Sequence, residues 1–188
     1  MELGVIADPQ FVMTIEQRSI RSFHVQTTLQ RGVNEDPKTP GPDSSDEEKL
    51  IFIQANIVSF VTQYQLPIIE VALVVSKYVK ILTNSLIENA EENQEVVPDS
   101  LLESKRVSDA SVNPIITEFP LESLMEMVDE DRMDILDTIL RTSINKTEIA
   151  FPKVISILRD WEHITREQLA KATSPGHLFS PLEIPDGF

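Results

Sequence analysis

The fold is decided by SDEEKLIFIQANIVSFVTQYQLPIIEVALVVSKYVKILTNSLI, the stretch Ser45–Ile87. Its start fits a capping box, in which the Ser45 hydroxyl and the Glu48 carboxylate each satisfy a free backbone amide. Apolar residues then recur at steps of three and four, which predicts a helix over 46–65. Pro67 interrupts this pattern and suits the first position of a second helix, where its missing amide costs nothing.

The second helix is predicted from Ile68 to about Ile87. It is apolar around most of its circumference, with a narrow polar strip formed by Glu70, Lys77, Lys80 and Asn84. A helix of this kind is expected at the centre of a bundle, contacted on several sides. The segment 52–75 contains too many polar residues to cross a bilayer, so no membrane contact is expected.

The remaining chain predicts further short helices separated by breaks. Glu88–Asp99 reads as an acidic loop. Helices are predicted at 100–107, at 120–128, at 130–142 behind an Asp129 cap, from Pro152 onward, and from a second capping box at Thr165–Gln168 to about Ala172. The fold class is therefore all-α, an irregular helical bundle of about five to seven helices with an extended N-terminal arm and C-terminal tail.

Three regions are expected along the chain. Residues 1–45 form an extended N-terminal arm with a Pro-rich linker, and within it 19–27 suits a short strand or extended segment. Residues 46–174 form the helical domain. Residues 175–188 form an extended apolar tail, whose prolines argue against a helix.

Both terminal arms carry apolar side chains outside the helical block. Such residues pack either on their own domain or on a neighbour. We expect partner binding at a set drawn from both arms: Ile20, Phe23, Val25, Phe179, Leu182, Ile184 and Phe188.

The net charge is −15, and most of it lies between Ile87 and Asp137. This stretch contains fifteen acidic residues and three basic ones, Lys105, Arg106 and Arg132. This field repels phosphate backbones and anionic membranes, so no nucleic-acid or lipid partner is expected. It favours a basic protein surface or a cation; the alternative is that the acids only maintain solubility.

The chain has no cysteine, which excludes disulfides and thiolate chemistry. Its first residues show no secretory signal, so a cytoplasmic location is expected, or a virion if the source is viral. The three histidines are isolated, and no serine elbow or glycine-rich phosphate loop occurs. The sequence therefore predicts no catalytic residue and no cofactor.

One carboxylate pattern points to an enzyme. Glu92 and Glu95 form an E-x-x-E pair, and Glu126 and Asp129 form an E-x-x-D pair. This pairing is similar to that of the MazG-like family of all-α nucleoside triphosphate pyrophosphohydrolases, and the resemblance implies a Mg²⁺ site at those four residues. In that family the first pair lies within an amphipathic helix, whereas here it falls in the predicted loop.

Two smaller patterns complete the candidates. Glu130, Asp134 and Asp137 share one helical face, which suits either a cation or a solvated polar surface. Thr39, Ser44 and Ser45 resemble kinase substrates, and a phosphate there would lie near a helix N-terminus.

The leading hypothesis is a non-enzymatic interaction or structural subunit of a larger homo- or hetero-oligomeric assembly, a composition also typical of virion and phage components. The alternatives are the Mg²⁺-dependent pyrophosphohydrolase and a phospho-regulated adaptor.

Overall fold

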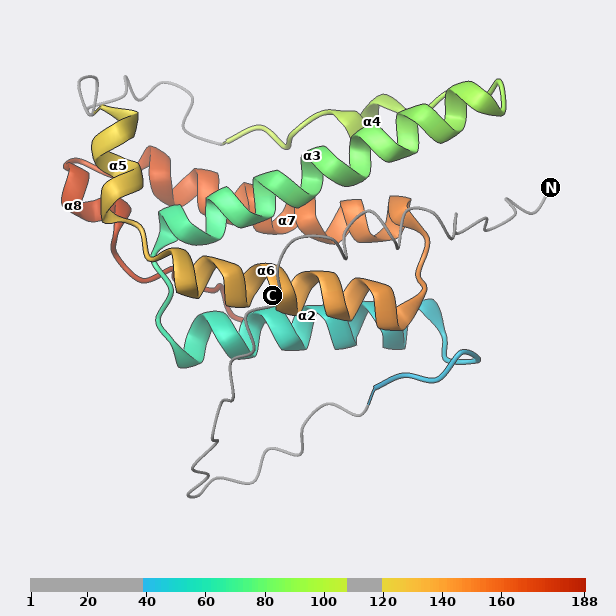
Figure 1. Cartoon of the computed structure of the whole chain (residues 1–188), viewed down its shortest axis with the longest axis horizontal. Helices are drawn as coiled ribbons and strands as arrows, with labels where there is room; N and C mark the ends of the chain where they lie inside the picture. Colours follow the sequence, from blue (N-terminus) through green and yellow to red (C-terminus); the bar gives the residue numbers. More distant parts are fainter. Residues whose placement is uncertain (1–38, 108–119) are drawn as a thin grey trace.

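The computed structural model describes residues 39–107 and 120–188, which contain seven helices and no strand. The four long helices are α2 (Asp46–Gln63), α3 (Ile68–Glu92), α6 (Glu130–Thr147) and α7 (Phe151–Ala170). The three short ones are α4 (Asp99–Leu102), α5 (Leu121–Met127) and α8 (Pro175–Leu178). Figure 1 shows them as one helical bundle, which confirms the predicted fold class. The predicted N-terminal segment at 19–27 lies outside the described residues.

The long helices pack in two pairs, α3 against α7 and α2 against α6. In Figure 1 the α3–α7 pair lies above the α2–α6 pair, and α2 forms the lower edge of the bundle. Across the pairs, α2 and α7 run in the same direction, because Lys153 pairs with Asp46 and the Trp161 indole donates to Gln54 Oε1 at 2.8 Å.

The core fills the space between the pairs with aliphatic residues and one tryptophan. Its fully buried members come from all four long helices and include Ile53, Ile57, Val71, Val75, Leu136, Leu140, Ile155, Leu158 and Trp161. The capping box at the start of α2 is confirmed: Ser45 Oγ accepts from the Glu48 amide at 3.2 Å, and the Glu48 carboxylate accepts from the Ser45 amide at 2.9 Å.

Three helix boundaries differ from the prediction. α3 continues to Glu92, because the strong helix formers of Glu88–Glu92 extend it beyond its apolar stretch. α6 continues to Thr147, whose buried hydroxyl donates to the backbone carbonyl of Ser143 at 3.0 Å. α4 is a single turn rather than the eight-residue helix expected at 100–107.

The second predicted capping box, at Thr165, is wrong. α7 runs unbroken from Phe151 to Ala170, and Thr165 lies in its interior, where its hydroxyl donates to the backbone carbonyl of Glu162 at 2.9 Å. The same side chain chemistry that caps a helix can bond back to a carbonyl inside one. In this protein the apolar face of α7 packs continuously against α3, which favours an unbroken helix over a helix start at Thr165.

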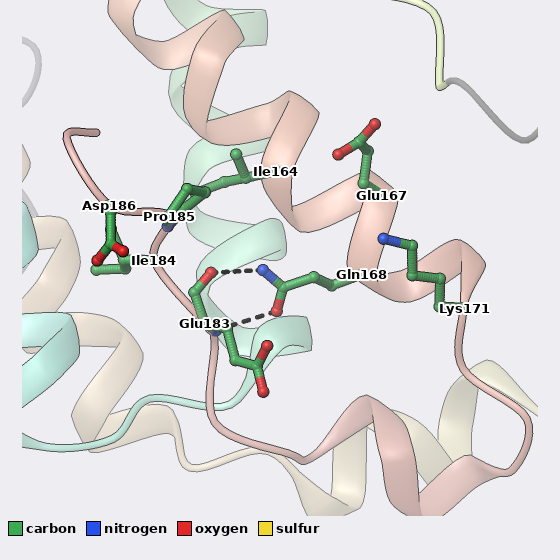
Figure 2. Close-up of a pocket in the computed structure, with 8 residues that line it drawn as sticks. All are labelled: Ile164, Glu167, Gln168, Lys171, Glu183, Ile184, Pro185 and Asp186. Carbon is green, nitrogen blue, oxygen red and sulfur yellow. Dashed lines mark hydrogen bonds between the residues drawn. The ribbon is translucent and has the colours of Figure 1, made fainter.

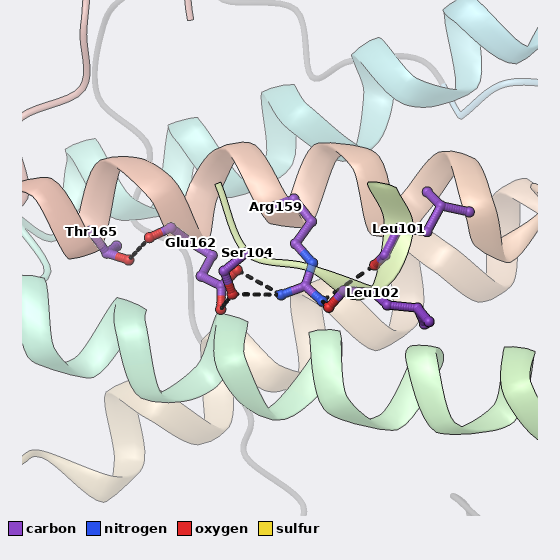
Figure 3. A network of polar contacts seen from close by, with 6 residues as sticks. All are labelled: Leu101, Leu102, Ser104, Arg159, Glu162 and Thr165. Carbon is purple, nitrogen blue, oxygen red and sulfur yellow. Dashed lines mark hydrogen bonds and ion pairs between the residues drawn. The ribbon is translucent and has the colours of Figure 1, made fainter. Parts of the chain in front are cut away.

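The segment after α4 is fastened to α7 by a buried arginine (Figure 3). The Arg159 guanidinium donates to Ser104 Oγ at 3.0 Å and to Glu162 at 2.8 Å, and it also reaches the carbonyls of Leu101 and Leu102. These two carbonyls end α4, where a cation is favoured by the helix dipole. Arg159 thereby holds the C-terminal end of α4 and the following Ser104 against α7.

The C-terminal tail begins with a helical turn, which corrects the expectation of a wholly extended segment. Pro175 can occupy the first turn of α8 without losing a hydrogen bond. Beyond α8 the chain is extended and forms an isolated antiparallel bridge between Pro181 and Pro67. The Leu182 amide donates to the Leu66 carbonyl at 2.9 Å, which ties the tail to the α2–α3 turn.

Candidate interaction surface

The described chain exposes an unusual combination of side chains on α5 and the first half of α6. Met125, Met127 and Ile135 are 41%, 56% and 47% exposed. The same two helices carry five exposed carboxylates, none of which forms an ion pair with the described residues: Glu122, Glu126, Glu130, Asp131 and Asp134. We call these eight residues the acid–methionine surface.

The methionines of α5 are exposed, whereas other side chains at this helix are buried in the bundle. Leu124 within α5 and Val128, the residue that follows the helix, are both buried. Met125 and Met127, which lie between or beside these buried positions, remain exposed. The helix is only seven residues long, so its position depends on what fastens its ends.

The junction between α5 and α6 is fastened by an ion pair between a buried carboxylate, Glu70, and a partly exposed guanidinium, Arg132. Glu70, in the first turn of α3, has a fully buried side chain. Its carboxylate accepts two hydrogen bonds from the Arg132 guanidinium, at 2.7 and 3.0 Å, and a third from the Asp129 amide at 3.0 Å. Asp129 in turn caps α6 by accepting from the Arg132 amide at 3.0 Å. All of the carboxylate's hydrogen bonds therefore hold the start of α6 on α3.

Electrostatics stabilise the same junction. The hydrogen bond with Glu70 raises the pKa of Arg132 further above its usual range, so the guanidinium stays charged. Farther along the same two helices, Asp137 pairs with Lys77 at 2.6 Å, and the Asp137 backbone carbonyl accepts from the Tyr78 hydroxyl at 3.0 Å. Burial, assisted by the charge of Asp137, raises the pKa of Tyr78 well above its usual value and keeps this donor protonated.

The sequence placed Glu70 on an exposed polar strip with Lys77, Lys80 and Asn84. The latter three are exposed, but Glu70 is not. A helical pattern cannot distinguish a solvated carboxylate from a buried one whose partner lies about sixty residues away.

The tail residues expected to bind a partner instead pack on their own domain. Leu182 is buried, and Ile184 packs against the core. Phe188 packs edge-on against Trp161, with ring centroids 5.0 Å apart. Phe179 is half-buried at the end of α8. Partner binding at these four residues stays a prediction.

A side-chain amide helps to hold the tail. The Gln168 carboxamide pairs with the Glu183 backbone, accepting from its amide at 3.0 Å and donating to its carbonyl (Figure 2). The shallow hollow beside this contact is lined by α7 and tail residues, among them Glu167, Lys171 and Asp186. The three remaining predicted residues, Ile20, Phe23 and Val25, lie outside the described part of the chain.

The structure does not bring the two carboxylate pairs together. Asp129 lies against Glu70 in the first turn of α3, whereas Glu92 ends the same helix. At 1.5 Å per residue, these positions are about 33 Å apart along the helix axis. Glu126 lies in α5 beside Asp129, and Glu95 follows α3. Ligands of one Mg²⁺ ion lie within about 2.1 Å of it, so these four carboxylates cannot share an ion.

The other sequence candidates are also accounted for. Asp137 pairs with Lys77, so it does not join Glu130 and Asp134 as a free carboxylate. Among residues 39–107 and 120–188, no group of three or more His, Asp or Glu side chains could hold a metal ion. The hydroxyl of Ser45 caps α2, Ser44 Oγ accepts from the Gly41 amide at 3.1 Å, and Thr39 is exposed.

Comparison with known proteins gives no relative: the chain matches no protein-family model, no curated protein and no solved structure. No helix in the described ranges is long and apolar enough to span a membrane. The functional conclusion therefore depends on the geometry and charge of the surfaces themselves.

Proposed function

We propose that this protein is a non-enzymatic interaction subunit of a larger assembly, which docks a basic partner on its acid–methionine surface. The observation that carries the proposal is the exposure of two methionines and an isoleucine on helices that also carry five carboxylates with no ion pair to residues 39–107 or 120–188. Large exposed apolar side chains rimmed by charge mark interaction sites more often than solvated faces.

The chemistry of the surface indicates the kind of partner. Methionine side chains are flexible and polarisable, so they adapt to apolar groups of different shape. The surrounding carboxylates attract lysine and arginine and repel acidic proteins, which gives selectivity and speeds association. A segment that presents apolar residues on one side and lysine or arginine on the other satisfies both requirements.

The buried Glu70–Arg132 pair supports this proposal, because a binding surface has to be held in position before the partner arrives. Three hydrogen bonds to the Glu70 carboxylate hold the start of α6, directly after α5, on α3. The surface is thus a preformed part of the bundle.

Binding of a defined peptide tests the proposal. The probe is an amphipathic helical peptide of leucine and lysine, titrated into the full chain by calorimetry, with the leucine–glutamate peptide as its negative counterpart. We expect the lysine peptide alone to bind. The double substitution Glu130→Lys/Asp134→Lys should weaken it at least about tenfold, because two attractive contacts become repulsive.

The matched control changes the same net charge elsewhere. Glu88 and Glu91 are exposed near the end of α3, away from the acid–methionine surface. Glu88→Lys/Glu91→Lys should alter the affinity less than about threefold through the general field alone. Equal losses in both double variants would show attraction to the net charge rather than to a site and would refute the proposal.

A further inference from the structure

A second surface lies on the outer side of α2. Ile51, Ala55, Val58 and Thr62 follow one another at steps of four, three and four residues, which places them on one helical face. That face lies opposite the buried stripe formed by Ile53, Ile57 and Phe60. We call these four residues the outer α2 stripe.

The stripe is accessible in the described structure. Ile51 is 60% exposed, Thr62 is exposed and Ala55 is half-buried. Val58 is also half-buried, because part of its side chain packs against the core. Figure 1 shows α2 at the edge of the bundle, with α6 on its inner side. Of the four long helices α2 has the weakest separation of apolar and polar faces. A helix that is apolar on opposite faces is usually covered on both.

The stripe also differs from the rest of the molecule in charge. No Asp, Glu, Lys or Arg occurs between Leu50 and Ile69, in a chain whose net charge is −15. The nearest carboxylates, Glu47 and Glu48, lie one turn before Ile51 at the end of the stripe. The rest of the stripe offers a basic partner no carboxylate. Two copies of the chain repel each other across their acidic regions, and this repulsion is least where two uncharged faces meet.

We propose that the chain self-associates through the outer α2 stripe, with a second copy of the same stripe as its occupant. The pairing is two-fold, so that each residue of the stripe contributes twice. This inference does not depend on the basic partner, which binds a different part of the molecule.

The charge of the whole chain sets how the association responds to conditions. One helix face is a small interface, so the dimer is weak and depends on concentration. Salt shortens the range of repulsion between the two acidic copies without weakening apolar contact. Self-association should therefore become stronger as the salt concentration rises.

Analytical ultracentrifugation of the full chain, from about 1 μM to about 500 μM, tests the proposal. We expect a reversible monomer–dimer equilibrium that shifts toward the dimer with added NaCl. Ile51→Lys should raise the dimer dissociation constant at least about tenfold, since each dimer contains the substitution twice. Val96→Lys is the matched control, because Val96 is 92% exposed in the loop after α3 and should leave the equilibrium unchanged.

A cross-linking experiment gives an independent measurement. The chain has no cysteine, so Ala55→Cys introduces a unique thiol near the middle of the stripe. Two thiols bridge only when their Cα atoms come within about 7 Å. Mild oxidation should produce a covalent dimer from Ala55→Cys and none from Ser76→Cys, an exposed position on α3.

Three results would overturn the inference. The first is a monomer at every concentration and salt level. The second is an equal effect of Ile51→Lys and Val96→Lys on the dimer. The third is protection of the Ala55→Cys thiol from alkylation in the monomer, because that result would mean that the chain itself covers the stripe.

Discussion

The acid–methionine surface and the outer α2 stripe both expose apolar side chains, yet they suit opposite kinds of partner. Met125 and Met127 lie among carboxylates, whereas Ile51 lies in a stretch of the chain without any charged residue. Apolar exposure alone would predict that both surfaces bind the same kind of partner. We infer from the difference in surrounding charge that one surface suits a basic partner and the other suits the same uncharged face on a second copy of the chain.

The two surfaces also differ in what holds them. The outer α2 stripe belongs to a long helix whose other face supplies Ile53 and Ile57 to the core. The acid–methionine surface belongs partly to α5, a short helix fastened through the buried Glu70–Arg132 pair. Damage to that pair should therefore affect one surface and spare the other.

Arg132→Ala should have the largest effect. It leaves the fully buried Glu70 carboxylate without its partner, and breaking a buried ion pair in this way costs about 3 kcal/mol or more. Urea unfolding should show that loss, and hydrogen exchange should show faster exchange in α5 and the first turn of α6. The hydrogen-exchange rates of α2 amides should rise only as much as the global loss of stability accounts for. Faster exchange confined to α2 would contradict the assigned role of the pair.

Leu182→Ala should have the next largest effect, on stability alone. The side chain is buried where the tail crosses the α2–α3 turn, and truncating such a leucine costs about 2 kcal/mol. Affinity for the lysine peptide and the dimer dissociation constant should both stay within about twofold of the parent values. A large loss of either under conditions where the variant is folded would show that the tail belongs to that surface.

Met125→Gln/Met127→Gln should have a smaller effect, confined to peptide binding. Both side chains are substantially exposed, so stability should change by less than about 0.5 kcal/mol per substitution. Removing their apolar contact should weaken the lysine peptide about fivefold and leave the dimer unaffected. Unchanged calorimetric affinity would mean that the carboxylates alone attract the peptide.

Much of the fold could be predicted from the sequence, because its signals are local. The Ser45 capping box, the break at Pro67 and the helical spacing of Ile53, Ile57 and Phe60 each depend on residues a few positions apart. The structure has these features at the expected positions. The errors occurred where a local signal was overruled by packing, as at Thr165, whose hydroxyl bonds back inside a continuous α7.

The candidate site could be predicted much less well, because its parts are distant in the sequence. The acidity of 87–137 was evident, but the pairing of Glu70 with Arg132 joins two helices and has no local signature. The apolar tail was expected either on its own domain or on a neighbour, and only the structure shows the contact of Phe188 with Trp161. A shared patch of carboxylates at Glu92 and Asp129 was conceivable from spacing and is excluded by the length of α3.

The opposite response of the two surfaces to salt tests the central claim most directly. The unmodified chain is measured at about 0.05 M and about 0.5 M NaCl, by ultracentrifugation for the dimer and by calorimetry for the lysine peptide. We predict that added salt raises the dimer fraction and lowers the peptide affinity several-fold. If the dimer fraction and the peptide affinity both rise or both fall with added salt, charge does not determine which partner each surface binds, and the account is contradicted.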